Sequence, residues 1–192
     1  MSRKKAADLP AISFGAEVCG DPVGALGLEW IETNGIGGFA SSTVIGANTR
    51  RYHGLLVAAL SPPAGRFLTL AKLDEEIVTS SGPTGIGVNY YPGAVFPEGF
   101  RYIESFSLDP FPRWIYRVED IFLEKTVALE YGRNAVWVEY RVREGDGGPA
   151  AGGEEFRLSA RPLFAFRDYH GLTKRNDECD MKVHGSDRKS VV

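Results

Sequence analysis

Apolar and polar residues alternate along several segments of this chain, and no segment shows a sustained helical period. In one of them, Val136, Val138, Tyr140 and Val142 would fall on one face of a strand, and Glu139, Arg141 and Arg143 on the other. Segment 156–161 alternates in the same way, and runs 52–60 and 121–130 are further strand candidates. Glycine- and proline-rich turns separate these runs. The pattern therefore predicts an all-β fold, an antiparallel β-sandwich.

The 192 residues suit one domain with short flanking segments. We expect a flexible tail over 1–14, the sandwich domain over 15–172 and a polar tail over 173–192. The glycine-rich run 145–153 is expected to be a flexible hairpin loop or a surface insertion within the domain. The last residues, 187–192, offer nothing obvious to pack. They are either an artefact at the end of a truncated gene or an ordinary frayed terminus.

Composition excludes several classes of protein. Net charge is −3 and no basic stripe is present, so nucleic acid is not expected as a partner. No apolar run approaches the roughly 20 residues that a membrane span requires, and the basic start lacks the apolar stretch of a signal peptide. The two cysteines, Cys19 and Cys179, lie far apart and are interpreted as reduced thiols. Together these features predict a cytoplasmic protein.

The segment Asn34-Gly35-Ile36-Gly37-Gly38 lies between two strand-like runs. Its glycines, with Ala40, formally fit a dinucleotide fingerprint, but that motif requires a helix to follow. Residues 41–46 favour a strand instead. We therefore expect a tight turn whose bare backbone at Gly37 and Gly38 lets a ligand or another domain approach closely.

A second polar group follows this turn. In an extended segment, Arg51 and His53 would share one face of the chain, and their donors and acceptors suit sugar hydroxyls. Trp30 and Phe39 could supply the apolar platform on which a pyranose ring stacks. Two alternatives remain open: the polar pair could be a solvated strand end, and the aromatic residues could belong to the core.

Metal and catalytic signals are weak. His53, His170 and His184 are isolated, so neither a metal nor another cofactor is expected. Motifs for a serine nucleophile are absent from the sequence. The carboxylates at 74–76 would point to opposite faces of a strand, and we interpret them as a charged turn or a strand edge. No residue is therefore assigned a catalytic role.

The glycine turn and the polar segment also carry a family resemblance. Segments 29–41 and 49–58 closely resemble the N-terminal domain of bacterial and archaeal glycogen debranching enzymes of the amylo-α-1,6-glucosidase type. Later pieces are similar too, namely 65–66, 72–75, 100–103, 109–112, 123–125, 161–163 and 167–170. The resemblance covers about residues 15–172.

This resemblance implies a supersandwich, galactose-mutarotase-like fold packed on a downstream (α/α)6 barrel that carries the acid and base carboxylates. The sequence ends before such a barrel, so we expect a C-terminally truncated domain that is inactive by itself and whose partners are glycogen or maltodextrin and the missing barrel. The expected substrate-binding residues are Trp30, Asn34, Gly37, Gly38, Arg51 and His53. Two other functions are weighed: a free-standing carbohydrate-binding module and a structural β domain that docks a partner.

Overall fold

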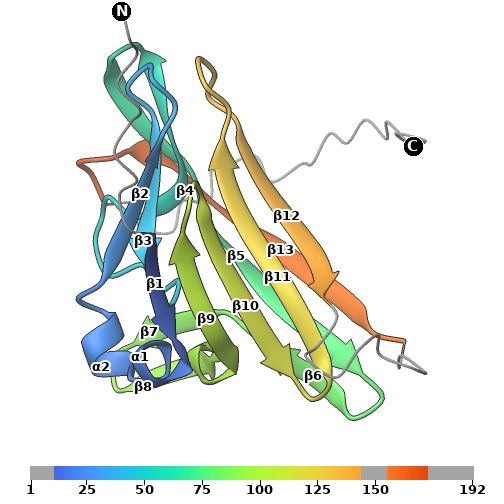
Figure 1. Ribbon diagram of the computed structural model, residues 1–192. Helices are drawn as coiled ribbons and strands as arrows, with labels where there is room; N and C mark the ends of the chain where they lie inside the picture. Colours follow the sequence, from blue (N-terminus) through green and yellow to red (C-terminus); the bar gives the residue numbers. More distant parts are fainter. Residues whose placement is uncertain (1–10, 144–154, 173–192) are drawn as a thin grey trace, which may run out of the picture.

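The structure is a computed structural model that describes residues 11–143 and 155–172. These residues form two layers of antiparallel strands, which confirms the predicted all-β sandwich (Figure 1). One layer is a five-stranded sheet in the order β1 (Ile12–Gly15), β9 (Ile103–Leu108), β10 (Pro112–Val118), β11 (Ile121–Leu129) and β12 (Val136–Arg143). The other is a six-stranded sheet in the order β13 (Arg157–Asp168), β5 (Ala64–Thr79), β4 (Gly54–Ser61), β3 (Phe39–Thr43) and β2 (Glu29–Thr33), with β6 (Gly82–Gly85) paired to β5.

Small elements close the lower end of the sandwich in Figure 1. They are two short helices, α1 (Ala16–Cys19) and α2 (Pro22–Ala25), a hairpin of β7 (Val88–Tyr91) and β8 (Ala94–Glu98), and the 3-10 turn η1 (Gly99–Tyr102). An Asp21 side-chain oxygen accepts from the Val23 backbone N–H at 3.1 Å and caps α2. In the described residues no helix is long and apolar enough to cross a membrane.

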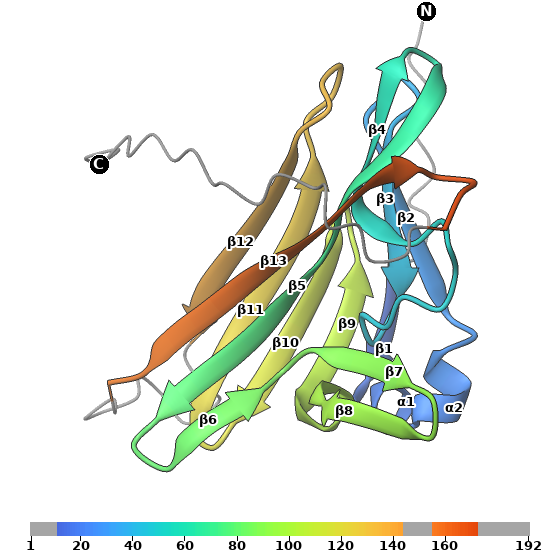
Figure 2. The same cartoon turned by 180° about the vertical axis from the view of Figure 1, so that it is seen from behind.

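Strand β5 organises the six-stranded sheet because it is long enough to pair with three others. Its first half pairs with β4, its last residues pair with β6, and β13 runs along almost its whole length. Figure 2 shows β13 and β5 side by side across the back of the molecule. Residues at opposite ends of β5 and β13 are therefore held in a fixed relative position by the same strand pair.

Alternation along β12 sets which side chains enter the core, as expected. Val136, Val138 and Tyr140 pack against the buried cluster, whereas Trp137, on the opposite face, is exposed. Val142, expected on the inward face, is 60% exposed at the end of the strand. Because the side-chain period of a strand is two residues, one inward-facing residue determines which other residues of the strand point to the same side.

Two indoles connect the layers at the centre of the core. Trp30 of β2 and Trp114 of β10 meet edge to face with ring centroids 5.6 Å apart, and Phe106 lies 5.1 Å from Trp114. Each indole N–H also donates to a carbonyl at the end of β3: Trp30 to Thr43 at 3.2 Å and Trp114 to Val44 at 2.6 Å. Buried aromatic area and satisfied N–H groups together stabilise this contact.

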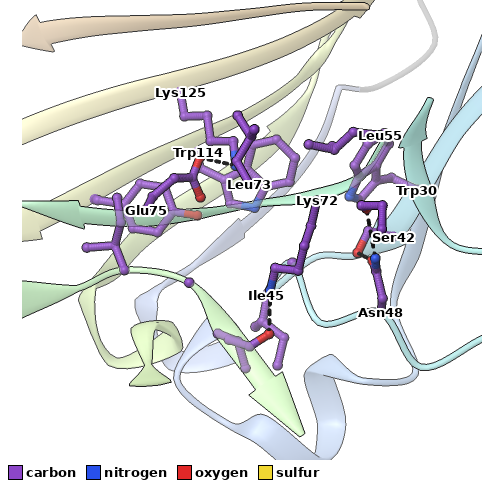
Figure 3. A pocket seen from close by; sticks show the side chains of 16 residues that line it. Trp30, Ser42, Ile45, Asn48, Leu55, Lys72, Leu73, Glu75, Trp114 and Lys125 are labelled. Atoms are coloured by element: carbon purple, nitrogen blue, oxygen red, sulfur yellow. Dashed lines mark hydrogen bonds and ion pairs between the residues drawn. The ribbon is translucent and has the colours of Figure 1, made fainter. Parts of the chain in front are cut away.

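A buried ion pair also bridges the layers, and it corrects the interpretation of 74–76 as a charged turn or strand edge. Glu75 lies inside β5 and pairs at 2.5 Å with Lys125 of β11; their side chains are 3% and 10% exposed. Tyr140 donates to the same Glu75 oxygen, and Lys125 lies 5.6 Å from the Trp114 ring centroid. Figure 3 shows Glu75, Lys125 and Trp114 close together. The sequence pattern missed this pair because it joins strands 50 residues apart.

The expected boundaries need one correction. Residues 12–14, assigned from the sequence to a flexible tail, belong to β1, which pairs with β9 from Ile12↔Leu108 to Gly15↔Ser105. The short strand was not recognised because it has only four residues and one cross-strand neighbour. The predicted loop at 145–153 and the polar tail at 173–192 lie outside the described residues.

Replacing Lys125 by methionine is expected to lower the free energy of unfolding by about 3–5 kcal/mol, because Glu75 then remains buried without its cation. Urea denaturation measures the change. Adding Glu75→Gln should recover much of the loss, since a neutral amide still accepts from Tyr140. The matched control is Arg141→Ala, which breaks an exposed pair with Glu139 and should cost about 1 kcal/mol or less. Equal losses for Lys125→Met and Arg141→Ala would contradict this account.

Candidate functional site

The segment between β3 and β4 is a structured loop held at several points. The Thr43 hydroxyl donates to the Ala47 carbonyl and accepts from the Ala47 N–H, at 2.9 and 3.0 Å. The Asn48 side chain accepts from Ser42 and donates to the carbonyl of Ala71 on β5, at 2.8 and 2.9 Å. These bonds fix the loop to both β3 and β5 before it reaches Arg50.

His53 closes this loop from the inside, which corrects the expected extended geometry. Its ring Nδ1 accepts from the backbone N–H groups of Thr49 and Arg50, at 3.1 and 3.4 Å, and the backbone N–H of His53 donates to the Arg50 carbonyl at 3.0 Å. Residues 50–52 therefore turn, and β4 begins at Gly54. His53 is only 3% exposed whereas Arg51 is exposed, so the two side chains do not share a face.

Arg51 instead joins residues that lie far away in the sequence. We call this group the arginine–tyrosine cluster; it comprises Arg51, Tyr52, Arg66, Arg167, Tyr169 and His170. Arg51 donates to the His170 carbonyl at 2.9 Å, and Arg167 donates back to the Arg51 carbonyl at 2.5 Å. The loop after β3 and the end of β13 are thus locked together.

The aromatic members of the cluster, Tyr52, Tyr169 and His170, all contact one another. The Tyr52 ring centroid is 5.2 Å from that of Tyr169, which in turn lies 4.0 Å from the His170 ring. The Tyr52 hydroxyl and His170 Nδ1 are 3.1 Å apart. Phe39 meets Tyr169 edge to face at 6.5 Å. Phe39 therefore supports the cluster from β3.

Arg66 connects the cluster to the glycine turn. Its Nε donates to the Gly37 carbonyl at 2.7 Å, its Nη1 donates to the Tyr169 hydroxyl at 3.3 Å, and its guanidinium lies 5.6 Å from the Tyr169 ring centroid. A Cβ on Gly37 would lie 2.5 Å from the Pro63 carbonyl oxygen, and Gly37 has φ +99°, so glycine is required at this position. The turn and Arg51 are linked through Arg66 and Tyr169.

Asn34 holds the glycine turn from within. Its Oδ1 accepts from the N–H groups of Ile36 and Gly38, at 3.1 and 2.9 Å, and its Nδ2 donates to the Arg133 carbonyl at 2.9 Å and to the Asn134 amide oxygen at 3.2 Å. Asn34 and Gly38 are buried. Both were expected to bind substrate, but the Asn34 side chain is buried and the Gly38 backbone is covered.

Trp30 also faces the interior and cannot serve as a platform for a sugar ring. The cavity beside it, seen in Figure 3, measures about 30 Å³. That is room for one or two water molecules and not for a pyranose. Of the expected substrate-binding residues, Arg51 and the Gly37 backbone reach the cluster, whereas Trp30, Asn34, Gly38 and His53 build the frame around it.

The chemistry of the cluster suits recognition of hydroxyl groups. Guanidinium groups are multiple donors in a fixed plane, and tyrosine rings offer flat faces to a sugar ring. Hydrolysis of a glycosidic bond requires two flanking carboxyl groups. The six side chains of the cluster are arginines, tyrosines and a histidine and so do not supply two carboxyl groups; beside them, Asp168 accepts from the backbone N–H of His170 at 2.8 Å. The described residues also contain no group of three side chains able to hold a metal ion.

Arg66, Arg167, Tyr169 and His170 were not among the expected site residues. Their segments were noted only as further pieces of the family resemblance. Spacing alone gave no signal, because Arg51 and His170 are 119 residues apart in sequence and meet only when β13 aligns with β5.

Burial lowers the pKa of His53 below its ordinary 6.5; the Glu29 carboxylate opposes this effect and Arg50 adds to it. Below pH 6.5 the unfolded chain therefore protonates His53 more readily than the folded chain does. The free energy of unfolding should fall as the pH drops from 6.5 toward the pKa of folded His53, whereas above pH 6.5 the ionisation of His53 should not affect it. His53→Asn keeps an acceptor near the Nδ1 position without titrating. Its Tm, followed by circular dichroism, should fall less between pH 7 and pH 5.5 than that of the wild type. Parallel Tm profiles would contradict the assignment.

A comparison with protein families matches residues 28–192 to the family described as glycogen debranching enzyme N terminal. The fold and the cluster define a β-sandwich with a polar, aromatic-rich surface. The chain belongs to the glycogen debranching enzyme N-terminal family, as the resemblance implied. Comparisons with curated proteins and with solved structures returned no match.

Proposed function

We propose that this chain is the substrate-side and scaffolding domain of an enzyme that hydrolyses α-1,6-glucosidic branch points in glycogen or maltodextrin. In this proposal the arginine–tyrosine cluster contacts the glucan. The observation that carries it is the position of Arg51 and Tyr52: both are exposed, yet both are held by bonds to His170. Groups fixed before the ligand arrives lose little conformational entropy on binding.

Catalysis is assigned to another part of the enzyme. The acid and base carboxylates would belong to an (α/α)6 domain, and this sandwich would orient the branched substrate toward them. We also propose a cytoplasmic location. Cys19 is a free thiol, which is in keeping with this location because the cytosol keeps thiols reduced. Burial also raises the pKa of this thiol to about 11, so it stays protonated.

Arg51→Ala is expected to weaken glucan binding at the cluster by several-fold to tens-fold, since a hydrogen bond contributes about 0.5–1.5 kcal/mol, and more when one partner is charged. The measurement is a titration of the chain with maltoheptaose, followed through the backbone amide signals of Tyr52 and His170. Arg141→Ala removes an equally charged exposed side chain on β12 and should leave the affinity unchanged. An unaltered dissociation constant for Arg51→Ala would overturn the proposed role of the cluster.

The chain by itself is expected to release no glucose from glycogen or from a branched dextrin. A positioned acid or base typically contributes about 10²–10⁴-fold to the rate, and the arginine, tyrosine and histidine side chains of the cluster do not provide the required pair. A glucose assay against a buffer blank tests this expectation. Clear release above the blank would place the catalytic groups within this chain and contradict the division of roles.

A further inference from the structure

A second concave surface lies on the other half of the β5–β13 pair. It is a cleft of about 640 Å³ between these two strands and the β7–β8 hairpin, lined among others by Asp74, Glu76, Asn89, Tyr91, Phe96 and Arg161. This volume falls within the roughly 300–1,000 Å³ of small-molecule sites. Figure 2 shows β6 beside the lower part of β5 and the chain continuing from β6 into the β7–β8 hairpin.

The alternation of β5 aims two carboxylates into this cleft. Glu75 faces the core, so its neighbours Asp74 and Glu76 face outward. Arg161 on β13 is the register partner of Asp74, which places its backbone directly across the strand pair. The cleft thus has acceptors on one strand and a guanidinium donor on the next.

A half-buried lysine outside the cleft lining holds two of the lining residues, Asn89 and Asp74, in place. Lys72 Nζ donates to the Val88 carbonyl at 2.8 Å and to the Asn89 amide oxygen at 2.7 Å. The Asn89 Nδ2 group then donates to Asp74 Oδ1 at 3.1 Å. Side chains that are held in this way need little reordering when a ligand binds.

Two other charged groups in the cleft are not engaged in this way. Within the described ranges, the side chains of Glu76 and Arg161 have no ion-pair partner. Glu98 and Arg101, by contrast, pair with each other at 2.6 Å on the wall of the cleft. Among the described residues, nothing thus occupies the Glu76 carboxylate or the Arg161 guanidinium, and both can bind hydroxyl groups.

The hairpin contributes exposed aromatic faces. Tyr91 is 55% exposed and Phe96 is 72% exposed, an unusual position for a large apolar ring. The hairpin that carries them is held close to β6, because a Cβ on Gly85 would lie only 2.8 Å from the Pro97 side chain. The rings are thus presented at the cleft by packed backbone.

This combination selects a neutral polyhydroxy ligand. Carboxylates at Asp74, Glu76 and Glu98 outnumber the guanidinium groups of Arg101 and Arg161, so a phosphate would be repelled. Carboxylates accept readily from hydroxyl groups, and aromatic rings pack on the apolar face of a pyranose. We propose that this cleft binds a segment of a neutral glucan chain, with a sugar ring on Phe96 and hydroxyl groups held by Glu76 and Arg161.

The cleft and the arginine–tyrosine cluster would then be two contact points on one support. Arg161 in the cleft and Arg167 in the cluster lie on the same strand, six residues and hence roughly 20 Å apart. A branched glucan offers two chains, or two parts of one chain, to such a pair of sites. The choice of a glucan as ligand rests on the proposed function, whereas the position and chemistry of the cleft do not.

The test is a titration of the chain with maltoheptaose, followed through the amide signals of Asn89 and Phe96. Phe96→Ala and Glu76→Gln are each expected to weaken binding there by roughly three- to tenfold, since one aromatic contact contributes about 0.5–1.5 kcal/mol. The matched control is Phe164→Ala, which removes a similarly exposed ring from β13 that does not line the cleft. It should leave the affinity at the cleft unchanged.

The outcomes separate this inference from the proposed function. If Phe96→Ala and Glu76→Gln bind as tightly as the wild type while Arg51→Ala weakens binding at the cluster, the cleft inference is wrong and the proposed function stands. If the cleft variants lose affinity and Arg51→Ala does not, the cleft stands and the cluster fails. No shift of the Asn89 and Phe96 signals at saturating maltoheptaose, or a loss of affinity for Phe164→Ala equal to that for Phe96→Ala, would also overturn the cleft.

Discussion

The edge-to-face contact of Trp30 with Trp114 is the interaction on which the two layers depend. It places one indole from each sheet at the centre of the core, 5.6 Å apart. Both N–H groups are satisfied by carbonyls at Thr43 and Val44, so the contact also fixes the end of β3. Burying an indole whose N–H has no acceptor would cost stability. Because the acceptors here lie at the end of β3, the packing of the sheets also positions the loop that follows β3.

From that anchor the functional surface is assembled in steps. Thr43 and Asn48 hold the loop, His53 closes it with its ring, and Arg51 is left pointing outward, where β13 can reach it. Thr43 and His53 are buried, and most of the bonds in these steps are made to backbone groups. The groups that remain exposed are thus held in place, so they would lose little conformational entropy on binding a ligand.

The long β5–β13 pair explains why two candidate sites occur on one small sandwich. Its register is continuous apart from bulges near Leu163 and Phe164, and it carries the cleft at one end and the arginine–tyrosine cluster at the other. Outward-facing positions along a strand pair are not needed by the core. They can therefore hold charged and aromatic side chains without loss of stability.

The sequence by itself determined the all-β class, the inward faces of strands such as Val136–Arg143 and the tight turn at Gly35–Gly38, because these depend on local periodicity and backbone preference. It also pointed to the family through two short segments. It could not decide that Trp30, Asn34 and His53 face inward, nor that Glu75 pairs with Lys125. Only the tertiary structure settled those roles and brought Arg51 to His170, because strand register joins residues that no local pattern relates.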